Sequence, residues 1–147
     1  MARRARPLNA CLEQVDNNRV KFEGTHNGYQ RLPGKVIHNR IVEYERTSGW
    51  CFKDNLLGNG THYVESYIHL APDLKIVNVN DSPLIILEEG SDVWIAEIRL
   101  PENLQVEVVK GNYFPEFGIK NENQVIRLFG EVELPFHTVY GVRSIRP

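Results

Sequence analysis

The stretch Trp50–Leu70, WCFKDNLLGNGTHYVESYIHL, decides the fold class. Two runs rich in aromatic and β-branched residues, Trp50–Leu57 and Thr61–Leu70, flank the three residues Gly58, Asn59 and Gly60. Glycine and asparagine supply the positive φ angles that a hairpin turn needs. The spacing therefore predicts two antiparallel strands that pair with each other through this turn.

Similar runs recur along most of the chain. Residues Ile37–Glu45 alternate polar and apolar side chains with one slip, the period-two pattern of a half-buried strand. Turns rich in Pro, Gly, Asn and Asp separate the further runs, which are Val20–Glu23, Leu74–Val79, Leu84–Leu87, Val93–Leu100, Leu104–Val109, Val125–Phe129 and Phe136–Val142. Short strands without crossover helices predict an all-β fold, an antiparallel β-sandwich of roughly ten or more strands with no substantial helix.

Length and composition are those of one globular domain. The 147 residues contain no internal repeat or linker, so we expect a single β-sandwich domain over 1–147, with residues 1–19 the least regular part. The net charge of −2 gives no pull toward nucleic acid or an anionic membrane. No run reaches the roughly 18 apolar residues of a membrane helix, and the N-terminus lacks the apolar core of a secretion signal. Cys11 and Cys51 are expected to be reduced.

Candidate chemistry is concentrated between His26 and Arg40. Phosphate-binding glycine loops, serine-nucleophile elbows and zinc-protease motifs are all absent. His26 precedes Asn27 and Gly28, which predicts a bend where its side chain leaves the sheet. Two interpretations stay open for His26: a metal ligand through a neutral imidazole nitrogen, or a turn residue bonded to the backbone.

His38 and Arg40 form the second candidate site. They lie two residues apart on one predicted strand, so their side chains point the same way, roughly 7 Å from each other. An arginine fork and a histidine donor together bind a carboxylate or a sulfate. The alternative is that Arg40 pairs with Glu43 or Asp54. Asp54 is either a ligand or the polar residue that ends a buried strand.

Several segments, taken in order, carry a family resemblance: His26-Asn27-Gly28-Tyr29, His38-Asn39-Arg40, Trp50-Cys51-Phe52-Lys53-Asp54, Gly58-Asn59-Gly60-Thr61-His62 and His69-Leu70-Ala71-Pro72. Their order and spacing resemble the C-terminal part of the heparinase II/III-like polysaccharide lyases. The resemblance covers nearly the whole chain.

The resemblance implies an enzyme that cuts uronic-acid polysaccharides, such as glycosaminoglycans, by β-elimination. In that family the catalytic acid and base lie mostly on an α/α toroid domain, which this chain lacks. We therefore expect a C-terminal β-sandwich fragment with no catalytic residues, inactive alone. His26 matches a family histidine that in some members resembles a ligand of structural zinc, although Asn27 stands where the family has Asp.

The implied substrate contacts are Tyr29, Arg31, His38 and Arg40. The implied partners are an acidic polysaccharide and the toroid domain, and the implied location is bacterial periplasmic or extracellular. An open sheet edge would also favour a homodimer.

A competing hypothesis is a non-catalytic carbohydrate-binding or interaction sandwich. It requires an exposed aromatic platform, for which the candidates are Trp50, Trp94, Tyr63 and Tyr67. The alternative is that these strand aromatics belong to the core.

Overall fold

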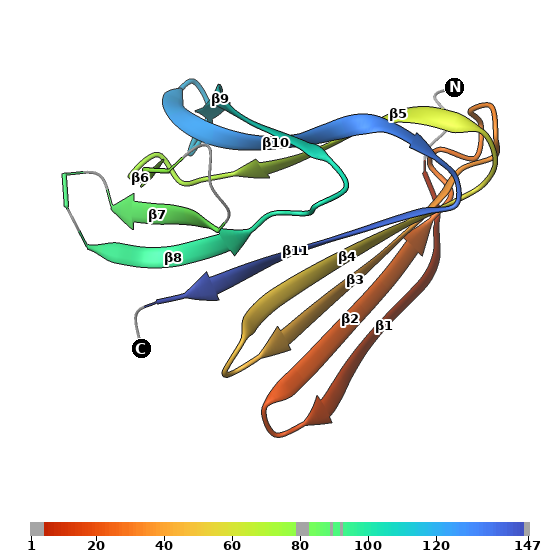
Figure 1. Ribbon diagram of the computed structural model, residues 1–147, viewed down its shortest axis with the longest axis horizontal. Helices are drawn as coiled ribbons and strands as arrows, with labels where there is room; N and C mark the ends of the chain where they lie inside the picture. The colour runs from red at the N-terminus through yellow and green to blue at the C-terminus, as the bar shows by residue number, and fades with distance from the viewer. Residues whose placement is uncertain (1–4, 79–82, 89, 92, 146–147) are drawn as a thin grey trace. The chain divides into compact units, whose positions relative to one another are not determined.

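The computed structural model describes residues 5–78, 83–88, 90–91 and 93–145. These residues form eleven strands in two antiparallel sheets and no helix, so the all-β sandwich prediction is confirmed (Figure 1). The strands are β1 (Pro7–Asp16), β2 (Arg19–His26), β3 (Ile37–Glu45), β4 (Gly49–Leu57), β5 (Thr61–His69), β6 (Leu74–Ile76), β7 (Leu84–Glu88), β8 (Trp94–Arg99), β9 (Gln105–Tyr113), β10 (Asn121–Glu133) and β11 (Phe136–Ser144).

The chain divides into two compact units. The first unit contains residues 1–63 and 131–141, and the second unit contains residues 64–130 and 142–147. Strands β5, β10 and β11 contribute residues to both units. The prediction of a single domain over 1–147 stays a prediction. In the described ranges no helix is long and apolar enough to cross a membrane.

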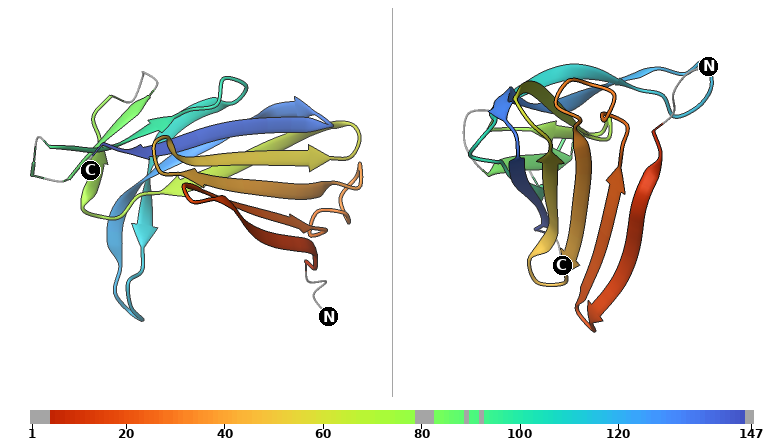
Figure 2. Two further views of the ribbon diagram at one scale, coloured as in Figure 1. Left: turned by 90° about the horizontal axis from the view of Figure 1, so that it is seen from below. Right: turned by 90° about the vertical axis from the view of Figure 1, so that its right-hand side faces the viewer.

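The first unit is built on a sheet with the strand order β1-β2-β3-β4-β11 (Figures 1 and 2). Two long hairpins, β1/β2 and β3/β4, form most of it. Residues 1–19, expected to be the least regular part, instead contain the ten-residue strand β1. Its alternation of Leu8, Ala10 and Leu12 with polar neighbours, followed by a turn at Asn17-Asn18, is a weak strand signal that pairing with β2 completes.

One face of this sheet is apolar. Leu12 pairs with Phe22, Phe22 with Val42, and Val42 with Phe52, so their side chains form a row across four strands. Phe52 stacks on Tyr140 of β11, with ring centroids 4.7 Å apart. Exposure rises along the row from 7% at Tyr140 to 40% at Phe22 and 72% at Leu12. The apolar face therefore opens to solvent toward β1.

The predicted hairpin between Trp50–Leu57 and Thr61–Leu70 is wrong in its pairing. The two runs are strands, but β4 pairs with β3 and β11, whereas β5 pairs with β10 in the other sheet. The amide of Asn59 donates to the Gly34 carbonyl at 3.1 Å, and the Gly60 carbonyl accepts from Leu134 at 3.0 Å. The glycine link thus bonds to other turns of the first unit. It connects two sheets, because local turn chemistry does not choose a strand's partner.

The second unit holds the best-buried apolar side chains. Strands β8, β7 and β6 lie next to the end of β11, and β5, β10 and β9 form the three-stranded sheet. Leu84 and Ile86 of β7 and Ile126 and Leu128 of β10 are each no more than 2% exposed. Gln124 joins the two sets of strands, since its side-chain oxygen accepts from the Ile76 amide at 2.7 Å.

The predicted strands of the second unit are all present, with β10 considerably longer than expected. Of the predicted run Leu74–Val79, the strand covers Leu74–Ile76, and Val79 lies outside the described residues. Cys11 is exposed and Cys51 is half-buried, and the two are not bonded to each other.

Candidate functional site: a histidine-aspartate-arginine network

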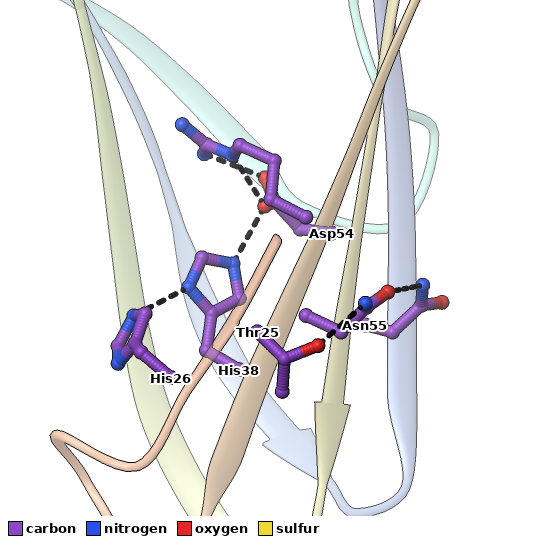
Figure 3. A network of polar contacts seen from close by, with 7 residues as sticks. Thr25, His26, His38, Asp54 and Asn55 are labelled. Atoms are coloured by element: carbon purple, nitrogen blue, oxygen red, sulfur yellow. Dashed lines mark hydrogen bonds and ion pairs between the residues drawn. The ribbon is translucent and has the colours of Figure 1, made fainter. Parts of the chain in front are cut away.

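Four of the polar side chains singled out above meet in the first unit. His26 ends β2 and pairs in register with His38 at the start of β3, while Arg40 of β3 pairs with Asp54 of β4. Because His38 and Arg40 are two residues apart, all four side chains share one face of the sheet. Figure 3 shows His26, His38 and Asp54 joined in a line by hydrogen bonds.

The groups at the two ends of the network fix which atom donates in each hydrogen bond. The Gly28 amide can only donate, and it lies 3.1 Å from Nδ1 of His26. An ionised Asp54 can only accept, and its Oδ1 lies 2.6 Å from Nε2 of His38. The intervening contact of 3.1 Å then runs from Nε2–H of His26 to Nδ1 of His38. This assignment places the proton of both neutral imidazoles on Nε2.

Asp54 is the centre of charge in this network. It is only 6% exposed and accepts a two-pronged bond from Arg40, with Nε 2.7 Å from Oδ1 and Nη2 2.8 Å from Oδ2. Burial acts to raise the pKa of Asp54, but hydrogen bonds from His38 and Arg40 outweigh it and leave that pKa below its ordinary value. The bond to Asp54 likewise raises the pKa of Arg40. The carboxylate and guanidinium therefore stay ionised.

His26 is poised to remain neutral. Burial and the neighbouring His38 lower its pKa. The Tyr29 ring lies against it, with centroids 5.3 Å apart. A neutral His26 keeps its Nδ1 lone pair available for the Gly28 amide, so its protonation state is linked to the turn that follows β2.

That turn presents Tyr29 and Arg31 to solvent. Tyr29 is 45% exposed and Arg31 is exposed, with its Nε 3.4 Å from the Gly28 carbonyl. Asn27 anchors the turn, because its side-chain oxygen accepts from the Arg6 amide at 2.9 Å and its own amide donates to the Arg6 carbonyl at 3.2 Å. Asn27 thus holds the turn against the residue that precedes β1.

The structure brings His38 and Arg40 together as predicted, but their shared carboxylate is internal. Both donate to Asp54, which was the alternative partner considered for Arg40. The Arg40 side chain remains 38% exposed. The roles of Tyr29, Arg31, His38 and Arg40 in binding substrate stay predictions.

A second polar network, missed from the sequence, lies on the opposite face of the same strands. The side-chain amide of Asn39 donates to Thr25 at 2.9 Å, and that of Asn55 donates to Asn39 at 3.0 Å (Figure 3). Asn39 also donates to Glu23 at 3.1 Å. These residues alternate with those of the first network along each strand. That alternation was the available signal, since amide side chains facing one another across strands form ladders.

The network as placed does not fit a zinc ion. Both ring nitrogens of His26 and of His38 are engaged in hydrogen bonds, so neither imidazole has an uncommitted lone pair. Within the part of the chain that the structure describes, no group of three His, Cys, Asp or Glu side chains is placed to hold a metal ion. Structural zinc at His26 stays a prediction.

An all-β domain with a His-His-Asp-Arg network across three strands is the class that this geometry defines. The chain belongs to the heparinase II/III-like, C-terminal family, whose model matches residues 1–146. Comparison with curated proteins finds no match.

Solved structures share the fold. Heparan sulfate lyase HepC from Pedobacter heparinus is similar with a TM-score of 0.75 and 14% identity, over 95% of this chain and 21% of that one. A structure of heparinase III is similar with a TM-score of 0.68 and 12% identity, over 94% of this chain and 20% of that one. The chain thus spans about a fifth of the length of these proteins.

Proposed function

We propose that this chain acts as the C-terminal β domain of a polysaccharide lyase that cleaves uronic-acid polysaccharides by β-elimination. The family match over residues 1–146 carries the proposal, and the names of the similar structures, heparan sulfate lyase and heparinase III, support the substrate class. Such polymers lie outside the cytoplasm, so a periplasmic or extracellular location goes with the proposal.

In the elimination, the side chains of the network supply positioning rather than acid–base chemistry. β-Elimination needs a group that neutralises the uronate carboxylate, a base for the C5 proton and an acid for the leaving oxygen. The imidazoles of His26 and His38 are committed to hydrogen bonds, and Asp54 is held ionised between two donors. This cluster is therefore suited to positioning, and the acid and base belong to the toroid domain.

Substrate contact is assigned to the turn after β2. Arg31 offers a guanidinium to sulfate or carboxylate groups, and Tyr29 offers a ring face and a hydroxyl. Arg40 contributes less, because Asp54 already neutralises its charge and would repel a second anion. His38 and Arg40 serve chiefly to hold His26 and the turn in place.

Binding is tested first on the chain itself, by titration calorimetry with heparan sulfate and with an uncharged dextran. Binding to heparan sulfate that weakens with salt is the expected result. Arg31→Gln should weaken it several-fold, while Arg99→Gln, the same change at an exposed arginine of β8, should leave it unchanged. Equal losses in both variants would contradict a specific role for the turn.

Elimination is tested in a longer polypeptide that joins a toroid domain to this chain. The measurement is the ultraviolet absorbance of the unsaturated uronate product. The joined protein should release this product and the chain alone should not. If the joined protein releases no unsaturated product from any glycosaminoglycan or from alginate, the proposal is overturned.

A non-catalytic carbohydrate-binding role is the second candidate, and one observation favours it. The four aromatic residues proposed as a platform are all about half exposed rather than core: Trp50 at 48%, Trp94 at 55%, Tyr63 at 58% and Tyr67 at 49%. Trp50 also packs on Tyr44, with centroids 4.7 Å apart. Fluorescence titration with neutral glycans separates the two roles, since only this second role predicts dextran binding that Trp50→Ala abolishes.

A further inference from the structure

The turn after β2 contains one of the two Asn-Gly steps of the chain, Asn27-Gly28, and the other is Asn59-Gly60. The side-chain amide carbon of an asparagine can be attacked by the backbone nitrogen of the next residue. Glycine leaves that nitrogen unshielded, because it has no side chain. The attack closes a five-membered imide ring, which water opens to aspartate or isoaspartate. What distinguishes Asn27-Gly28 is the set of groups that the fold places around it.

His26 faces the nitrogen that would attack. The Gly28 amide donates to Nδ1 of His26 at 3.1 Å, so the imidazole is placed to take its proton. The N–H bond lies in the peptide plane, whereas an amide carbon approaches the nitrogen from above or below that plane. The base and the carbon under attack therefore do not compete for one position. Only glycine fits here, since a Cβ at position 28 would lie 2.9 Å from Cβ of Ala5 and 3.1 Å from Nδ1 of His26.

A hydrogen-bond donor faces the oxygen of the group under attack. The Arg6 amide donates to Oδ1 of Asn27 at 2.9 Å, and the Asn27 amide donates to the Arg6 carbonyl at 3.2 Å. Negative charge develops on Oδ1 as the nitrogen adds to the amide carbon, and a fixed N–H at this place stabilises that charge as an oxyanion hole does. The same pair of bonds holds Asn27 against the chain that precedes β1.

The polar network orients the base. Nε2–H of His26 donates to His38 at 3.1 Å, and Nε2 of His38 lies 2.6 Å from Oδ1 of Asp54 (Figure 3). This chain of bonds fixes the tautomer of His26 that turns its Nδ1 lone pair toward Gly28. A base held by a second group and a carboxylate follows the logic of hydrolase triads. The lone pair that is closed to an outside substrate is thus directed at a neighbouring residue.

We propose that Asn27-Gly28 is a self-modification site at which His26 acts as the general base. The bond from the Gly28 nitrogen to Cγ of Asn27 forms as the proton passes to Nδ1 of His26. The bond from Cγ to Nδ2 breaks as that proton is returned to Nδ2, which leaves as ammonia, and solvent water then opens the imide. The product adds one negative charge to the net charge of −2, giving −3, in the turn that presents Tyr29 and Arg31.

Peptide mapping by mass spectrometry tests the role of the fold, on the chain incubated at neutral pH and physiological temperature. Asn59-Gly60 is the internal reference, because it lies in an exposed turn where His62 donates to the Asn59 carbonyl at 3.0 Å rather than contacting the attacking nitrogen. Asn27 should convert faster in the folded chain than in the chain unfolded in urea, and Asn59 should show no such gain. Conversion of Asn27 in the folded chain at the urea rate or below it would overturn the proposal.

Variants test the base. His26→Gln keeps an oxygen that can accept from the Gly28 amide but offers no base. It should slow the conversion of Asn27 relative to Asn59 about tenfold, less than is typical of enzymes because imidazole is a weak base toward an amide nitrogen. His69→Gln, at an exposed histidine of β5, should leave this ratio unchanged.

Chemical rescue separates a base from a structural histidine. In His26→Ala, free imidazole in the buffer should restore part of the rate at Asn27 relative to Asn59, which the loss of a structural contact would not allow. Circular dichroism checks that each variant is folded. A ratio of Asn27 to Asn59 conversion that is the same in folded His26→Gln as in the wild-type chain would overturn the proposal.

Discussion

The two units are stabilised in different ways. The apolar side chains that are at most 2% exposed all belong to the second unit, and they are Leu84, Ile86, Ile98, Ile126 and Leu128. The first unit buries a carboxylate, Asp54, at 6% exposure, whereas Phe22 and Leu12 on the same face of the sheet are 40% and 72% exposed. Apolar burial is non-directional, whereas a hydrogen-bonded network fixes the geometry of its members. The second unit is therefore suited to stability, and the first to holding a surface in one arrangement.

The largest expected effect lies in the second unit. Leu128→Ala removes a side chain with no exposed surface and leaves a cavity, which should lower the free energy of unfolding by about 3 kcal/mol. Leu57→Ala, at a half-exposed residue of β4, should cost well under that, about 0.5 kcal/mol. Urea denaturation measures both. Similar losses from the two would remove the contrast in apolar burial between the units.

The next effect lies in the network of the first unit. Asp54→Asn removes the charge that pairs with Arg40, and we expect a cost of about 2 kcal/mol. Asp73→Asn, at an exposed turn, is the matched control and should be close to neutral. Nitrogen-15 NMR of the imidazoles gives a second readout, because the Nε2-protonated forms of His26 and His38 depend on the ionised Asp54. Unchanged imidazole signals in Asp54→Asn would contradict the network.

Acid should weaken the first unit in two steps. The pKa of His26 is lowered from its ordinary 6.5, so below pH 6.5 the unfolded chain binds more protons than the folded chain. The free energy of unfolding therefore falls as the pH drops through 6.5 toward the folded pKa. The lowered pKa of Asp54 produces a second loss below pH 3.8.

Comparing the wild-type chain with a variant that lacks His26 isolates the loss of stability at the higher pH. His26→Gln should flatten the dependence of unfolding free energy on pH between 7.5 and 5.5, a window that brackets the ordinary histidine pKa of about 6.5. The groups that face His26 are His38 and Tyr29, and both remain in this variant. A wild-type chain whose stability is level over this window would show that His26 is not kept neutral by folding.

Most strands could be predicted because period-two alternation is a local property. Ile37–Glu45 is predicted to the residue, and it is β3. The choice of a strand's pairing partner is not a local property. The predicted pairing of β4 with β5 through Gly58–Gly60 is wrong for this reason, since the backbone hydrogen bonds of this link go to Gly34 and Leu134. β1 was missed for the same reason, since its ten exposed residues carry a weak pattern that pairing with β2 completes.

Part of the candidate site could be predicted from the sequence. That His38 and Arg40 share a face follows from their spacing alone. Their convergence on Asp54 depends on the β3/β4 register, which the turn Arg46-Thr47-Ser48 sets by placing Arg40 opposite Asp54. The pairing of His26 with His38 was beyond prediction, because ten residues of irregular chain separate β2 from β3.

The smallest expected effect comes from an ion pair on the polar face of the first unit. Nζ of Lys53 lies 2.6 Å from Oε2 of Glu43, but the two side chains are 38% and 39% exposed, more than one-third each. Water and salt screen such a pair, and ordering two long side chains costs entropy that offsets the attraction. Lys53→Met should therefore change the free energy of unfolding by about 0.5 kcal/mol or less in urea denaturation, and by less still in high salt. A loss approaching that of Asp54→Asn would mean that the first unit depends on charge at its surface as much as in its buried network.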